Sequence, residues 1–453
     1  MTPPHLAPST PAAASPAPGP PRRPLLGRPA VALAAVWCVT RLLQVALVSD
    51  FFGQIGDEIN GEVHRIYFHW YEQLVTGVFP LDDVMWQYPP GAALVILSPA
   101  LLPGLSYFQA FVVLTLLVDA LVACALTRAG RETTGTTETT GRTESTGRTE
   151  SASTARSRAG AWVWVGGLPV LMHVPLVRYD VQVTALSVLS LLALLAARTS
   201  RRPGRTAALG GALAAVGALV KVWPVLALLG TPRGRTTRAA WTSALTSAVV
   251  LLGVLALAFS HTFDFLRQQG NRGVQIESIG GTLLSLARLL ELPDPGAYQV
   301  EYRYGAMEFV GPHVPALATA SLLLTGLAFC WLLIWRVRAR SWNAATVCDA
   351  ALCAVLLFVV TSRVISPQYM VWLIGLSAVC ASVRATTQRQ VVRLLLAAAV
   401  VSTLAYPLAY GQVTAGTWYG FLLMLVRNGL LLTAAVLSCR RLWVSSVATR
   451  GTR

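Results

Sequence analysis

The sequence predicts an all-α membrane protein, a polytopic bundle of transmembrane helices. Of its 453 residues, 54% are hydrophobic and only 12% are charged, whereas soluble domains carry roughly 25% charged residues. The apolar residues gather in runs, several of which approach the roughly 20 residues that a helix needs to cross a bilayer. Most arginines lie in the short polar gaps between these runs. These observations indicate a chain that folds inside a membrane.

The first apolar run follows a tail of different composition. Residues 1–28 are rich in proline, alanine and serine. They hold too little apolar surface to offset the entropy of ordering, so we expect a disordered tail. The apolar run 29–48 is longer than the core of a cleaved signal peptide. We therefore expect an uncleaved first helix with the tail in the cytoplasm.

The arginines divide the polar gaps into two alternating sets, as the positive-inside rule describes. Arginine-rich gaps lie at residues 128–158, 198–205, 233–238, 336–340, 384–393 and 440–453. Gaps poorer in arginine lie at 49–90, 260–315, 362–368 and 408–417. The first set is predicted to face the cytoplasm and the second the exterior of the plasma membrane. The net charge of +16 thus reflects topology, and no nucleic-acid partner is expected.

One membrane domain is expected over residues 29–440, followed by a cytoplasmic tail at 441–453. It should contain roughly ten to thirteen helices, some broken or re-entrant, because several apolar runs are too short to cross the bilayer straight. A Thr-Gly-Glu repeat lies within the low-complexity segment 128–160, which is predicted to be a cytoplasmic linker. Two long outward loops, 49–90 and 260–315, remain to carry function.

The first outward loop combines acids with aromatic residues, as sugar-binding sites do. Its acids are Asp50, Asp57, Glu58, Glu62, Glu72, Asp82 and Asp83, and its aromatic residues include Tyr67, Trp70, Tyr71, Trp86 and Tyr88. An aromatic face packs on the C–H face of a pyranose, while a carboxylate accepts hydroxyl protons and can act as a general base. The alternative is a solvated loop whose aromatic residues form an interfacial belt.

Basic residues at the outward ends of spans form a candidate phosphate site. Arg272 lies beside Gly273, which leaves room for close backbone approach, and a guanidinium can bind phosphate through two parallel hydrogen bonds. Arg178, Lys221 and Arg363 each lie at an interruption between apolar runs. These cations can converge on one lipid phosphate. The alternative for Arg272 is a basic loop that contacts anionic lipid.

Other ionisable residues occur in the middle of predicted spans, where they usually pair or serve a function. They are Arg41, Asp119, Asp349 and Arg427, and we expect interhelical pairing for them. The seven cysteines show no disulfide or metal spacing. Asp82 and Asp83 offer oxygen ligands for Mg²⁺ or Mn²⁺, but one adjacent pair is a weak metal signal, and the alternative for both is turn capping. No metal or other cofactor is therefore expected.

Several motifs, taken in order along the chain, resemble those of the family-87 glycosyltransferases. They are IYFHWYEQLVTGVFPLDD, WQYPPGA, VRYD, KVWP, RGVQIESI and ISPQYMVW, and the resemblance covers about residues 31–437. This family consists of actinobacterial membrane enzymes of the C-type superfamily that use polyprenyl-phosphate sugars. The resemblance implies a helical bundle with its active site at the outer face. The donor would carry mannose or another sugar such as arabinose, and the acceptor would be an envelope glycan or glycolipid.

The resemblance also assigns roles to individual residues. The family's base is an aspartate a few residues before a tyrosine in the first loop, and the matching position here is Glu62, ahead of Tyr67. Because glutamate is longer by one methylene and catalytic geometry is strict, Asp57 stays open as a rival base. Asp83 is a further acidic candidate. One carboxylate suffices for an inverting transfer, since polyprenyl phosphate is a good leaving group, unlike the case of a glycosidase.

The remaining candidates divide into phosphate ligands and contacts to the sugar or acceptor. The predicted phosphate ligands are Arg272, Arg178, Lys221 and Arg363. The predicted contacts are Tyr67, Trp70, Asp83, Trp86, Tyr88, Asp180, Glu277, Gln368 and Tyr369. Two alternatives stay open: a secondary transporter or lipid flippase, which also has about a dozen spans and broken helices, and a catalytically inactive relative. A transporter should show two related halves, and this sequence shows no such pair of halves.

Overall fold

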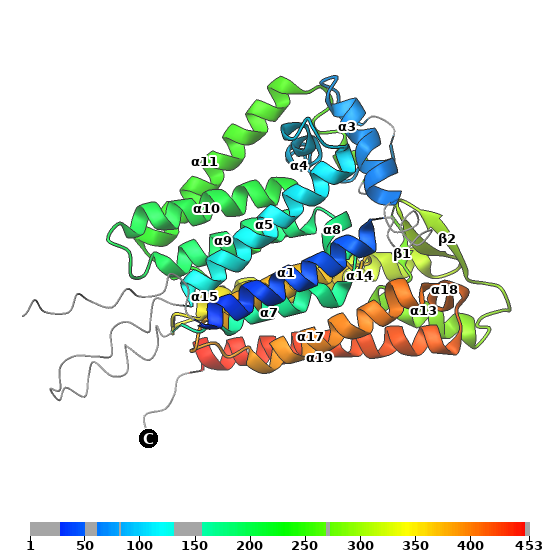
Figure 1. Ribbon diagram of the computed structural model, residues 1–453. Helices are drawn as coiled ribbons and strands as arrows, with labels where there is room; N and C mark the ends of the chain where they lie inside the picture. The colour runs from blue at the N-terminus through cyan, green and yellow to red at the C-terminus, as the bar shows by residue number, and fades with distance from the viewer. Residues whose placement is uncertain (1–27, 50–60, 81–82, 131–155, 269–271, 449–453) are drawn as a thin grey trace, which may run out of the picture.

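The computed structural model of the protein describes residues 28–49, 61–80, 83–130, 156–268 and 272–448. Within them the chain forms a bundle of helices with one small sheet (Figure 1). The predicted all-α membrane class is confirmed. Most of the expected N-terminal tail and of the Thr-Gly-Glu linker, together with Asp57 and Asp82, lies outside the described residues.

Seven helices of the described residues are long and apolar enough to cross a membrane. They are α1 (Arg28–Val48), α5 (Tyr107–Ala129), α10 (Pro203–Val220), α11 (Arg235–Ala258), α14 (Val314–Arg338), α17 (Arg389–Thr403) with the π-helix Leu404–Leu408 that continues it, and α19 (Trp418–Ser446). Shorter apolar helices contain α4 (Ala92–Leu97), α7 (Ala159–Gly167), α9 (Asp180–Ala196), α13 (Ile279–Leu289), α15 (Thr346–Thr361) and α16 (Tyr369–Ser382). The shorter ones have 10–17 residues, so they fall short of a straight crossing.

Two of the short helices form the centre of the bundle. Nearly every side chain of α15 and α16 is buried, and a helix that is apolar all round is typical of such a position. α16 packs against α7, α9 and α17, while α15 packs against α19. By contrast, α11 and α14 expose rows of aliphatic residues such as Leu257 and Leu322. We therefore assign these outer faces to lipid.

A buried ion pair joins two of the long helices. Arg41 of α1 donates to Asp119 of α5 from Nε to Oδ2 at 2.7 Å and from Nη2 to Oδ1 at 3.0 Å. The indole N–H groups of Trp37 and Trp164 also donate to this carboxylate, each at 2.7 Å. Interhelical pairing, which we expect for Arg41, Asp119, Asp349 and Arg427, is thus observed between Arg41 and Asp119. These donors offset the cost of removing the two charges from water.

The long polar segments gather at the end of the bundle remote from the last turns of α19 (Figure 1). The first contributes the π-helix Glu62–Tyr67 and α3 (Phe68–Leu74); the second contributes α12 (Phe265–Gln268), β1 (Val274–Gln275), β2 (Gln299–Arg303) and β3 (Ala306–Val310). The short helices α8 (Val174–Val177) and α18 (Tyr410–Ala415) and the 3₁₀ turns Ser98–Leu101, Leu168–Leu171 and Trp223–Leu228 complete the described elements.

The small sheet is a feature that the all-helical prediction omits. Its strand order is β1-β3-β2, and both pairings are antiparallel. The hairpin between β2 and β3 turns at Tyr304 and Gly305, whose φ angles are 52° and 76°. Positive φ at both central residues is what a type I′ hairpin turn requires. Polar and apolar residues alternate at 299–303, directly before the Tyr-Gly pair, and this pattern is the sequence signal that would have revealed the hairpin.

Candidate active site

A cleft opens at the end of the bundle where the two long polar segments meet. It has a volume of about 260 Å³. Its polar lining residues include Glu62, Arg178, Lys221, Arg272, Gln275, Glu277, Ser366 and Gln368, and its aromatic ones include Trp70, Tyr88, Trp223, Tyr304, Tyr369, Trp372, Tyr406 and Tyr410. Residues from motifs that are far apart in the sequence therefore share one cleft.

Glu62 begins the π-helix and forms an ion pair with Arg178. A π-helix is wider than an α-helix, and such turns are frequent at functional sites. Val63 and Tyr67 of this helix are buried, while Glu62 lines the cleft. Arg178 adopts an extended backbone, with φ −132° and ψ 142°, at the break between α8 and α9. The predicted base and one predicted phosphate ligand thus contact each other.

Lys221 caps the end of α10, and its ammonium group lies among a carboxylate and three rings. Its Nζ is 2.6 Å from Oδ1 of Asp180. The centroids of Tyr179, Trp372 and Tyr88 lie 4.6, 5.3 and 5.6 Å from Nζ, within the range of cation–π attraction. Burial lowers the pKa of Lys221 below its usual value, and the charge of Asp180 opposes that shift.

Arg272 lies just before β1 and is fixed to the hairpin. Its Nη2 donates to the carbonyl oxygen of Tyr304 at 2.9 Å, and its Nε is 3.4 Å from Oε1 of Glu308. The backbone N–H of Gly273 donates to the other oxygen of Glu308 at 3.0 Å. Burial raises the pKa of Glu308, whereas Arg272 lowers it. The strand that the sequence prediction omits therefore supplies the acid that orients Arg272.

Glu277 lines the cleft and has only 3% of its surface exposed. Its Oε2 accepts a hydrogen bond of 3.0 Å from Nε2 of Gln275, and its backbone carbonyl accepts one from Arg427 of α19. Burial raises the pKa of Glu277 to about 7, although Arg427 and Arg178 oppose the shift. A carboxyl group with this pKa can change its protonation state near neutral pH.

The segment before α16 borders two neighbouring hollows. It supplies Ser366, Gln368 and Tyr369 to the cleft. Arg363 instead lines a second hollow of about 510 Å³, which shares Arg272 and Tyr304 with the cleft. Burial, and after it the neighbouring charge of Arg272, lowers the pKa of Arg363 below its usual value. Their positive charges therefore act on the same small volume.

An aromatic layer supports the cleft wall from behind. Tyr67, Trp86 and Asp180 are buried and do not line the cleft. The ring of Trp70 stacks on Tyr67, with centroids 5.7 Å apart, and meets the ring of Trp86 edge to face at 5.0 Å. The predicted contact residues thus fall into two layers, in which Trp70 and Tyr88 reach the cleft.

Asp83 is engaged in its own turn. Its Oδ1 accepts a hydrogen bond of 2.8 Å from the backbone N–H of Met85, and its Oδ2 accepts one of 2.6 Å from the indole of Trp70. Asp83 is absent from the described cleft lining, and its geometry is that of the turn-capping alternative. Asp57 lies outside the described residues. Among the three acids predicted to be catalytic, Glu62 is the one that lines the described cleft.

Two tyrosines that line the cleft are not among the predicted contact residues. Tyr406 and Tyr410 lie at the π-helix after α17 and at the start of α18, and both line the cleft. Neither belongs to one of the motifs named above, although Tyr410 lies in the predicted outward gap 408–417 and Tyr406 just before it. Their rings meet edge to face, with centroids 5.0 Å apart.

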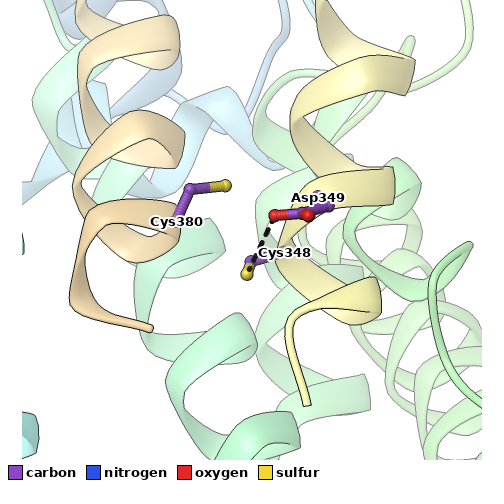
Figure 2. A group of neighbouring side chains, drawn as sticks. All are labelled: Cys348, Asp349 and Cys380. Carbon is purple, nitrogen blue, oxygen red and sulfur yellow. Dashed lines mark hydrogen bonds between the residues drawn. The ribbon is translucent and has the colours of Figure 1, made fainter. Parts of the chain in front are cut away.

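A group of metal-ligand type lies elsewhere, between α15 and α16. The sulfur atoms of Cys348 and Cys380 and a carboxylate oxygen of Asp349 lie within 4.8 Å of one another (Figure 2). Asp349 already accepts hydrogen bonds from the hydroxyl of Thr386 at 2.6 Å and from the backbone and hydroxyl of Thr387 at 2.9 and 2.8 Å. These bonds occupy the carboxylate, so we interpret the group as an anchor for the link between α16 and α17.

The cleft as a whole combines three cations, two acids and a wall of rings. Such a site can hold an anionic group beside a sugar and can move a proton. Comparison with known proteins agrees with this chemistry. Residues 86–367 match the family model of Glycosyltransferase family 87. No curated protein matches the chain.

Proposed function

Because this chain belongs to glycosyltransferase family 87, we propose that it transfers mannose from a polyprenyl-phosphate donor to a hydroxyl of a cell-envelope glycan or glycolipid. The chain is a membrane glycosyltransferase on the evidence of its family and its apolar helices. The sugar, the donor lipid, the acceptor and the side of the membrane are the proposed part.

The meeting of acid and cations in one cleft is the observation that carries the proposal. Glu62, Arg178, Lys221 and Arg272 come from four separate elements and line the same cleft. A sugar phosphate needs cations for its phosphate and flat apolar surfaces for its ring. The rings of Tyr88 and Tyr369, which are partly exposed and line the cleft, can supply those surfaces.

The hollow beside the cleft supports a lipid-linked donor. Arg272, Arg303 and Arg363 line this hollow together with Leu322 of α14. Leu322 is 69% exposed and belongs to the helix face that we assign to lipid. A donor could therefore keep its polyprenyl chain along α14, its phosphate at Arg272 and its sugar in the cleft. A free nucleotide sugar has no apolar chain that such an entrance would accommodate.

The transfer we propose is an inverting displacement at the anomeric carbon. The acceptor oxygen forms a bond to that carbon while the bond from the carbon to the phosphate oxygen breaks, and polyprenyl phosphate leaves with the electron pair. Glu62, or Asp57 as its rival, takes the proton of the acceptor hydroxyl. Arg272, with Arg178, Lys221 and Arg363, offsets the charge that develops on the phosphate.

The same proposal fixes the orientation in the plasma membrane. The cleft lies among segments 49–90 and 260–315, which are poor in arginine, and the arginine-rich gaps are cytoplasmic under the positive-inside rule. The N-terminus is then cytoplasmic and the active site extracytoplasmic, where envelope acceptors occur.

A transfer assay with purified full-length protein tests the proposal. Radiolabelled polyprenyl-phosphate-mannose and crude envelope lipids are supplied, and labelled product and released sugar are measured. We expect Glu62→Gln to reduce turnover by about 10²–10⁴-fold, the usual contribution of a general base. Glu72→Gln is the matched control, because Glu72 is an exposed acid of the neighbouring α3 and is absent from the cleft lining.

Two outcomes would count against the proposal, and a third would reassign its base. Absence of both transfer and hydrolysis would favour an inactive relative. Movement of the intact donor across liposomes without any transfer would favour a flippase. Equal activity in the parent and Glu62→Gln would move the proton acceptor to Asp57, which the corresponding Asp57→Asn variant tests in the same assay.

A further inference from the structure

Another large hollow lies at the opposite end of the bundle from the cleft. It has a volume of about 1320 Å³ and is lined by residues of the links 340–343 and 385–390 and of the segment 437–448 at the end of α19. Arg340, Arg389, Arg440 and Arg441 line it, and no acidic residue occurs among its described lining residues. We call it the arginine hollow.

The walls of the arginine hollow are fixed by hydrogen bonds between separate elements. The backbone N–H groups of residues 340 and 341 both donate to the carbonyl of Ser446, at 2.9 and 3.0 Å. Arg441 of α19 donates to the carbonyl of Thr387 at 2.7 Å and to Oε1 of Gln390 at 2.5 Å. The two links and the end of α19 are thereby held around one space, so the hollow is a built feature of the fold.

The carboxylate drawn in Figure 2 does not neutralise these arginines. Asp349 is 2% exposed and is absent from the lining of the hollow. Its oxygen atoms accept hydrogen bonds from Thr386 and Thr387 and so hold the 385–390 link from inside. Arg340, Arg389 and Arg440 are exposed, and their charges therefore act on the hollow without an acidic counterpart in its described wall.

The end of α19 gives this hollow an exposed aliphatic border. The 29 residues of α19 extend about 43 Å at 1.5 Å per residue, whereas the hydrocarbon core is about 30 Å thick. The last turns of α19 therefore reach the headgroup region. Val444 lines the hollow and is 58% exposed, and Val436 of the same helix is 69% exposed. Cations thus lie beside an aliphatic surface. This arrangement suits a phospholipid, whose phosphate is anionic and whose acyl chains are apolar.

We propose that the arginine hollow binds the phosphate of an anionic glycerophospholipid, with Arg340, Arg389 and Arg440 as its charge partners and the acyl chains along α19. Basic pockets between transmembrane helices on the cytoplasmic side are known to bind such headgroups. The positive-inside rule explains why arginines occur at this end. It does not explain a shared concave site that hydrogen bonds hold open and whose described lining residues include no acid.

Native mass spectrometry of the full-length protein in detergent tests this inference. The protein is titrated with dioleoyl-phosphatidylglycerol or with dioleoyl-phosphatidylcholine, which has the same chains and no net charge. The test variant is Arg340→Gln/Arg440→Gln. The matched control is Arg201→Gln/Arg205→Gln, since both residues are exposed, belong to an arginine-rich gap on the same predicted side, and lie outside the hollow.

We expect the parent to prefer phosphatidylglycerol and the hollow variant to bind it about 30-fold more weakly, since each arginine near an anionic headgroup is worth about 1 kcal/mol. The control pair should bind as the parent does. Equal weakening in both variants, or no preference between the two lipids in the parent, would overturn the proposal. Displacement of the lipid by millimolar inorganic phosphate would instead identify a site for a free anion. Arg389→Gln, a single exposed change, repeats the test if the double variant elutes as aggregate.

Discussion

Lys221 and Asp180 form an ion pair in which Nζ and Oδ1 are 2.6 Å apart, and the indole of Trp372 donates to the same oxygen at 2.6 Å. The pair joins the end of α10 to the start of α9. Tyr88 and Tyr179 also surround the ammonium group. Asp180 does not line the cleft, and its role is therefore structural: it holds the ammonium group of Lys221, which does line the cleft.

Removal of the lysine alone should destabilise the protein strongly. In Lys221→Met the carboxylate of Asp180 stays buried without its cation, and such a change typically costs about 3–5 kcal/mol in the free energy of unfolding. The double variant Lys221→Met/Asp180→Asn should recover part of this loss, since it leaves no buried charge. Denaturant unfolding of the parent, the two single variants and the double variant measures the coupling. Purely additive effects would contradict the pairing.

Stability should depend on pH through Glu277. Its folded pKa of about 7 lies above the ordinary value of 4.5, so the folded protein keeps a proton that the unfolded chain releases between these values. The contribution is complete below pH 4.5 and is lost as the pH rises through 7, an effect of up to about 3 kcal/mol. Glu277→Gln should therefore lose less stability than the parent between pH 5 and pH 8. Parallel unfolding curves for the two proteins would contradict this expectation.

The hairpin turn should matter for substrate affinity. Gly305 has φ 76° and lines the cleft. In Gly305→Ala a residue with Cβ must adopt this conformation, at a cost of roughly 1 kcal/mol. We expect the turn to shift and the KM for the donor to rise.

Gly296 provides a matched control for that change. Its φ is 77°, its surroundings are open, and it does not line the cleft. Gly296→Ala should lose similar stability and keep the parental KM. Thermal unfolding together with donor titration separates the two effects, and an equal change in KM for both variants would contradict a role for the turn in the cleft.

The helical membrane class could be predicted from two features of the sequence that are easy to recognise. Runs of apolar residues and the distribution of arginine determine which segments enter the bilayer, and these signals do not depend on tertiary contacts. The pairing of Arg41 with Asp119 was also within reach, because a charge in a span must find a partner. The partners of Asp349 could not be predicted in this way, because Thr386 and Thr387 are uncharged residues of a distant link.

The layout of the cleft was predictable only in part. Charged residues at helix breaks, such as Arg178 and Lys221, stand out by their unusual position in an apolar chain. Whether an aromatic residue lines the cleft or supports it depends on packing, so the motif alone could not separate Trp70 from Trp86. The pairing of Arg272 with Glu308 depended on a hairpin hidden between two long helices.

The cleft also offers a chemical handle, because Lys221 carries the only side-chain amine of the whole chain. A reagent that acylates or methylates amines would modify one side chain, Lys221, and add one mass increment there. The modified amine lies beside the rings of Tyr88 and Tyr179. Protection of that increment by a candidate ligand would report occupancy of the cleft directly. Such footprinting requires neither turnover nor an identified sugar.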